Sequence, residues 1–73
     1  MSIRTCFARE IYYARTEKNL TQAQAAEMLS ISVRWFQKIE KGEVLPSSEL
    51  TIKIVATLEI DGKRLKERHY LNV

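Results

Sequence analysis

The chain has 73 residues, a formal net charge of +3 and 45% apolar residues. This length fits one small domain spanning residues 1–73, with enough apolar side chains for a packed core. A single cysteine and a single histidine exclude an internal disulfide framework and argue against a metal or catalytic cluster, and no apolar run reaches the roughly 20 residues of a membrane span.

The same features indicate the location of the protein and argue against bound cofactors and enzymatic activity. The first residues contain no apolar stretch typical of a signal peptide, so we expect a cytoplasmic protein that does not contact a membrane. We also expect no cofactor, no metal and no small-molecule ligand. The chain has no catalytic cluster of polar side chains and no glycine-rich phosphate loop, so we do not expect an enzyme.

Five segments with helical periodicity follow one another along the chain. Capping residues and the few glycine and proline residues divide these segments. We predict helices over about residues 5–18, 21–29, 32–41, 47–59 and 61–70. The predicted fold class is therefore all-α.

The first two helices have recognisable ends. Phe7 and Ile11 recur at helical spacing in the first helix, and Asn19, which tolerates the left-handed conformation, is suited to end it. Thr21 to Gln24 then matches a capping box, in which each side chain satisfies the other residue's backbone amide. The sequence therefore predicts a second helix that starts at this box.

The third and fourth helices are also bounded by signals. The third follows Ser32, a good N-cap, and ends at Gly42. The fourth is rich in β-branched residues, so a strand is the rival interpretation. Apolar residues at 50, 54 and 58 and the start signal at Pro46 to Glu49 favour a helix.

The second and third helices are the informative part of the sequence. About three residues join them, which suits a helix-turn-helix unit, and Ala26 supplies a small residue where the two helices would cross. On a helical wheel Phe36 and Ile39 define the inward face of the third helix. The opposite face holds Arg34, Gln37, Lys38 and Lys41. These side chains can bind base edges and phosphates, although every surface helix has a polar outward face, so composition alone leaves the function open.

A set of short motifs at fixed spacing carries a resemblance. They are Leu20-Thr21-Gln22, Ala26, Leu29, Ile31-Ser32, Phe36, Lys38-Ile39-Glu40-Lys41-Gly42 and Pro46-Ser47. Together, over about residues 7–65, they resemble the phage-repressor/Cro-type (XRE) helix-turn-helix family. The resemblance implies a compact five-helix, lambda-repressor-like DNA-binding domain with residues 32–41 as the recognition helix.

The resemblance also implies roles for individual residues. The base-reading positions of the family fall on Ser32, Val33, Arg34 and Lys38. The positions that contact the DNA backbone fall on Thr21, Gln22 and Lys41, and we assign Gln37 to the same set because the family uses its position less consistently for bases. Arg15 and Glu40 match a partly buried ion pair that orients the recognition helix. No catalytic residue and no metal ligand is implied.

The chain departs from the family pattern at several positions. Ser30 stands where glycine is usual in the turn, and because the left-handed conformation costs a non-glycine residue about 1–2 kcal/mol, we expect a shifted turn. Asn19 and Glu59 also replace common glycines, and Gly62 replaces an apolar residue, which leaves the geometry of the last helix open. Trp35 replaces a small residue.

Two functions remain in competition at this stage. The first is a sequence-specific double-stranded DNA-binding transcriptional regulator, repressor-like and homodimeric at least on DNA. The second is a protein-interaction or antitoxin-like adaptor on the same fold, because fold alone does not determine function. A polar outward face on the third helix favours DNA, whereas Trp35 favours a protein partner.

Overall fold

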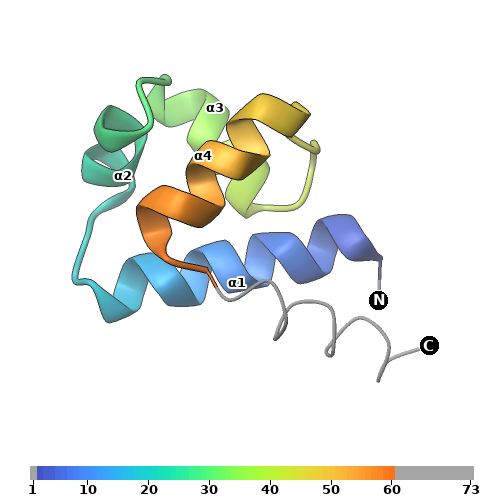
Figure 1. Cartoon of the computed structure of the whole chain (residues 1–73), viewed down its shortest axis with the longest axis horizontal. Coiled ribbons are helices and arrows are strands. Elements are labelled where there is room, and N and C mark those ends of the chain that lie inside the picture. Colours follow the sequence, from blue (N-terminus) through green and yellow to red (C-terminus); the bar gives the residue numbers. More distant parts are fainter. Residues whose placement is uncertain (1, 61–73) are drawn as a thin grey trace.

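The computed structural model describes residues 2–60, which form four helices and no strand. They are α1 (Ile3–Glu17), α2 (Gln22–Met28), α3 (Val33–Glu40) and α4 (Ser48–Leu58). The all-α prediction is confirmed, including the helical interpretation of the β-branched fourth segment. The expected fifth helix over 61–70, with Gly62, lies outside the described residues. Figure 1 shows the long helix α1 along one side of the molecule, with α2, α3 and α4 across from it.

Each of these four helices starts at a hydroxyl N-cap. The side chains of Ser2, Thr21, Ser32 and Ser47 each accept a hydrogen bond from a backbone amide three residues further on. Such a cap satisfies one of the amides that has no partner within the helix. The cap at Ser2 explains one difference from the sequence prediction, because α1 begins at Ile3 and not at about Thr5. The capping box at Thr21 and Gln24 is confirmed.

Each helix also ends with a residue in the left-handed conformation. These residues are Asn19 (φ 58°), Ser30 (φ 59°), Gly42 (φ 76°) and Glu59 (φ 56°). The next amide in each case donates to a carbonyl five residues back in the helix, from Leu20 to Arg15, Ile31 to Ala26, Glu43 to Lys38 and Ile60 to Val55. This closure satisfies carbonyls that the helix leaves open, so the chain uses one turn geometry four times.

The core lies where α1, α3 and α4 meet, with α2 packed on α3. Ile11 of α1, Phe36 and Ile39 of α3, and Ile54 and Leu58 of α4 are all buried. Their burial fixes which face of each helix turns toward solvent. None of the helices in residues 2–60 is long and apolar enough to cross a membrane.

Candidate nucleic-acid interface

The helix-turn-helix unit consists of α2, a short turn and α3. Ser30 takes the left-handed conformation in this turn, its amide donates to Glu27, and the next amide donates to Ala26. The expectation of a shifted turn at Ser30 is therefore wrong for this structure. Two backbone hydrogen bonds close the turn around Ser30 and hold it in the conformation that glycine adopts more easily.

The first turn of α3 presents three of the four predicted base-reading residues to solvent. Ser32, Val33 and Arg34 are all exposed, whereas Lys38, one turn further on, is half-buried. Phe36 and Ile39 occupy the opposite, fully buried face of the helix. The structure thus places Val33, Arg34 and Lys38 on α3 with Ser32 as its N-cap, and the N-terminal end of the helix is the most accessible part of this set.

Gln37 is not fully exposed, contrary to its place on the helical wheel. Its side chain is half-buried, and its amide Nε2 donates to Oε1 of Gln22 at 3.1 Å. A wheel considers α3 alone, whereas in the fold the start of α2 lies against this flank of α3. The pair fixes the orientation of the Gln22 side chain and leaves the amide group of Gln22 as a donor.

Thr21 and Lys41, the other two predicted backbone contacts, are both exposed. The hydroxyl of Thr21 accepts from the amide of Gln24 at 3.0 Å, and the amide of Thr21 donates to Oε1 of Gln24 at 2.8 Å. Lys41 follows the last residue of α3 as its C-cap. These contacts define where α2 begins and where α3 ends.

Gln22 and Lys41 line the same groove, which runs between α1, the start of α2 and the end of α3. Its volume is about 380 Å³, and we call it the α1 groove. The lining residues are Thr5, Ala8, Arg9, Tyr12, Tyr13, Gln22, Glu40 and Lys41. Two predicted backbone contacts are thus brought together with a face of α1 to which the sequence assigned no role.

Arg9 and Tyr12 line the groove, and neither belongs to the site that the sequence predicts. Both are exposed, and both lie on the face of α1 that contains Thr5. Positions 5, 9 and 12 follow helical i, i+4, i+7 spacing, which was a signal available in the sequence. The spacing alone does not identify a site, because the other residues of the groove come from two other helices.

The ion pair between Arg15 and Glu40 joins α1 to the end of α3 beside this groove. Arg15 Nη2 lies 2.7 Å from Glu40 Oε1, and Nε donates to both carboxylate oxygens at 3.1 and 3.3 Å. Nη1 donates to the carbonyl of Leu20 at 2.8 Å. Both side chains are well covered, with exposed fractions of 11% and 6%. The two-pronged geometry fixes the direction of α3 relative to α1.

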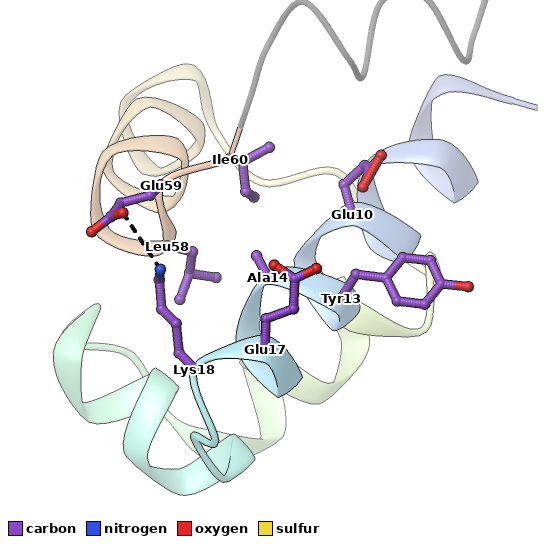
Figure 2. A pocket seen from close by; sticks show the side chains of 8 residues that line it. All are labelled: Glu10, Tyr13, Ala14, Glu17, Lys18, Leu58, Glu59 and Ile60. Carbon is purple, nitrogen blue, oxygen red and sulfur yellow. Dashed lines mark ion pairs between the residues drawn. The ribbon is translucent and has the colours of Figure 1, made fainter.

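A second hollow, of about 220 Å³, lies on another face of α1, against the end of α4. Figure 2 shows Glu10, Glu17 and Glu59 around it, with Lys18 reaching from α1 toward Glu59. Lys18 Nζ lies 3.6 Å from Glu59 Oε2. Within residues 2–60, three carboxylates and one ammonium group line this hollow, which we call the acidic hollow, so a phosphate would meet mostly negative charge there. Over residues 2–60 no group of histidine, cysteine or acidic side chains could hold a metal ion.

Comparisons with known proteins agree with this geometry. The sequence pattern of a family described as helix-turn-helix matches residues 11–65. The cryptic phage CTXphi transcriptional repressor RstR of Vibrio cholerae is 48% identical over 42 residues, which are 58% of this chain and 38% of that protein. This chain therefore spans about two fifths of the length of that relative.

A solved structure shares the fold. The crystal structure of the clp gene regulator ClgR from Corynebacterium glutamicum matches with a TM-score of 0.79 over 89% of this chain and 69% of that one. The sequence identity is 22%, so this likeness shows the arrangement of the helices and nothing more.

Proposed function

The chain belongs to this helix-turn-helix family, and we propose that it is a sequence-specific double-stranded DNA-binding transcriptional regulator of the repressor type. The observation that carries the proposal is the first turn of α3, where Ser32, Val33 and Arg34 stand exposed on a helix anchored from behind by Phe36 and Ile39. A helix presented in this way can enter the major groove.

Four side chains at the start and along the outer face of α3 each suit a particular feature of a base pair. The guanidinium of Arg34 can donate two hydrogen bonds to guanine, and Lys38 can reach the same guanine acceptors. Val33 offers an apolar contact for a thymine methyl group, and Ser32 can bond to several base edges. We therefore assign base reading to these four residues.

The DNA backbone contacts set the register of α3 in the groove. We assign them to Thr21, Gln22 and Lys41, because all three lie at the ends of α2 and α3 and carry groups that can donate to a phosphate. Gln37 acts through Gln22, because its amide donates to that side chain and holds it in one orientation. This role differs from the direct backbone contact that the sequence suggested for Gln37.

One α3 covers only a few base pairs, so useful specificity requires two copies of the domain. We propose a homodimer on a two-fold symmetric site with half-sites about one helical turn apart. The protein acts in the cytoplasm without enzymatic activity, and its regulatory effect comes from occupying the site.

The proposal is tested by selecting duplexes from a random pool with the wild-type protein and measuring affinity across a salt series. We expect log affinity to fall linearly with log salt. The Arg34→Ala, Lys38→Ala double variant should lose about 100-fold or more in affinity and its sequence preference, because each specific base contact contributes roughly 1–3 kcal/mol.

A Lys18→Ala, Lys53→Ala double variant is the matched control, because it also removes two positive charges. Lys18 lies at the acidic hollow and Lys53 is exposed on α4. This control should bind nearly as well as wild type. Failure of the wild type to bind any duplex at low salt would refute the proposal and favour an adaptor, to which the exposed Trp35 would contribute a protein contact.

A further inference from the structure

The α1 groove has a positive charge that no acidic partner in the described part of the chain neutralises. Arg9 and Lys41 line it, and neither forms an ion pair within residues 2–60. The carboxylate in its wall, Glu40, is already engaged by Arg15 through three contacts. The groove therefore offers two uncompensated cations to a ligand, and that ligand should be an anion.

Tyr12 adds a rigid neutral donor to the same groove. Its ring centroid lies 5.5 Å from the guanidinium carbon of Arg15 and 5.7 Å from the ring centroid of Tyr13, in an edge-to-face arrangement. The side chain is nevertheless 47% exposed, and the described residues give its hydroxyl no hydrogen-bond partner. A ring held in this way loses little conformational freedom when its hydroxyl binds an anion.

The groove is continuous with the interface proposed above. Gln22 and Lys41, both assigned to the DNA backbone, line it together with Arg9 and Tyr12. A backbone phosphate that approaches Gln22 and Lys41 would therefore meet the face of α1. The acidic hollow, in contrast, exposes the carboxylates of Glu17 and Glu59, which would repel the same group.

From these observations we propose that α1 is part of the DNA-binding surface and that Arg9 and Tyr12 bind a backbone phosphate together with Lys41. Arg9 and Lys41 donate charge-assisted hydrogen bonds to the phosphate oxygens, and the hydroxyl of Tyr12 donates a third. This inference rests on the proposed function, since it extends the interface of the same duplex. The contacts carry no base information, so they affect affinity equally for all sequences.

The first test compares three single variants on the duplex that wild type selects. Arg9→Gln should lower affinity by about tenfold and reduce the slope of log affinity against log salt by about 0.9 for each site occupied, because one phosphate contact is lost. Tyr12→Phe keeps the ring and its packing, and should lower affinity about threefold to tenfold with an unchanged slope. Lys18→Gln removes one charge from the other face of α1 and should match wild type.

The second test locates the contact with single neutral methylphosphonate substitutions in the duplex. At one phosphate position, the substitution should lower the affinity of wild type markedly. It should lower the affinity of Arg9→Gln and of Tyr12→Phe much less, because these variants already lack a contact to that phosphate. If the affinity loss from the protein variant and that from the phosphate substitution add at every position, the proposal is overturned. Thermal unfolding of each free variant, expected to match wild type, shows whether a loss arises from misfolding.

The outcomes separate this inference from the proposed function. If wild type selects no duplex, the proposed function itself fails. If wild type binds and the Arg34→Ala, Lys38→Ala variant does not, while Arg9→Gln and Tyr12→Phe bind like Lys18→Gln, only the role of α1 is refuted.

Discussion

Two faces of the same helix have opposite electrostatic character. On one face of α1, Arg9 lines the α1 groove together with Lys41, the C-cap of α3. On another face, Glu17 lines the acidic hollow together with Glu59, the C-cap of α4. Tyr13 lies on the border between them, since it lines both. Over residues 2–60, opposite charges thus gather on different faces of α1, which the formal net charge of +3 for the whole chain does not show. The arrangement of charges, and not their sum, indicates where DNA would bind.

The two faces also differ in the ion pairs that α1 makes with the rest of the fold. Toward α3, the side chains of Arg15 and Glu40 are 11% and 6% exposed and share several hydrogen bonds. Toward the end of α4, Lys18 and Glu59 are 33% and 77% exposed and meet at 3.6 Å. Water screens the second pair and hardly reaches the first, so the first should matter far more to the fold.

The largest expected effect breaks the covered pair. Glu40→Gln keeps the shape of the side chain but leaves the guanidinium of Arg15 without its counter-charge in a poorly solvated place. We expect the free energy of unfolding to fall by about 3 kcal/mol. Denaturant unfolding measures this, and Lys18→Gln, which breaks the exposed pair, should change it by less than about 0.5 kcal/mol. Equal losses for the two variants would contradict the contrast between the faces.

A smaller effect is expected from Gln37, whose amide donates to Gln22 beside the groove. Gln37→Ala should weaken binding to the selected duplex about fivefold, since Gln22 is no longer oriented toward the phosphate. Gln22→Ala should weaken it by a similar factor. The double variant should be no worse than Gln22→Ala alone, because the two residues act as one unit. Additive losses would mean that Gln37 contacts DNA independently.

The smallest effect concerns two left-handed residues, one beside each face. Glu59 (φ 56°) borders the acidic hollow, and Gly42 (φ 76°) lies against Thr5 and Ala8 of the groove. Glu59→Gly should raise the free energy of unfolding by about 0.5–1 kcal/mol, because glycine adopts this conformation without strain. Gly42→Ala should lower it by about 1 kcal/mol for the converse reason. A loss of stability in Glu59→Gly would show that the pair with Lys18 matters more than its exposure suggests.

Local chemistry made the helix boundaries predictable. Hydroxyl caps at Thr21 and Ser32 and the glycine after α3 each act within a few residues, so the sequence contains the whole signal. The start of α1 was misplaced because its apolar spacing becomes clear only at Phe7, whereas the cap lies at Ser2. The turn at Ser30 was misjudged because backbone hydrogen bonds outweigh the intrinsic preference of one residue.

The candidate site was predictable on α3 and only partly elsewhere. Periodicity correctly buried Phe36 and Ile39 and exposed Arg34. Periodicity could not predict that Gln37 is half-buried, because this depends on how α2 packs on α3. It gave no role to Arg9 or Tyr12 either, because the groove they line is closed by residues from two other helices.

The most direct test of the account is to follow the backbone amide resonances of the isotope-labelled protein while it is titrated with the selected duplex. The account predicts the largest shifts in the first turn of α3, at Gln22 and Lys41, and at Arg9 and Tyr12 on α1, with little change at Glu17 or Glu59. Shifts concentrated around the acidic hollow, with α3 and the α1 groove unchanged, would contradict it.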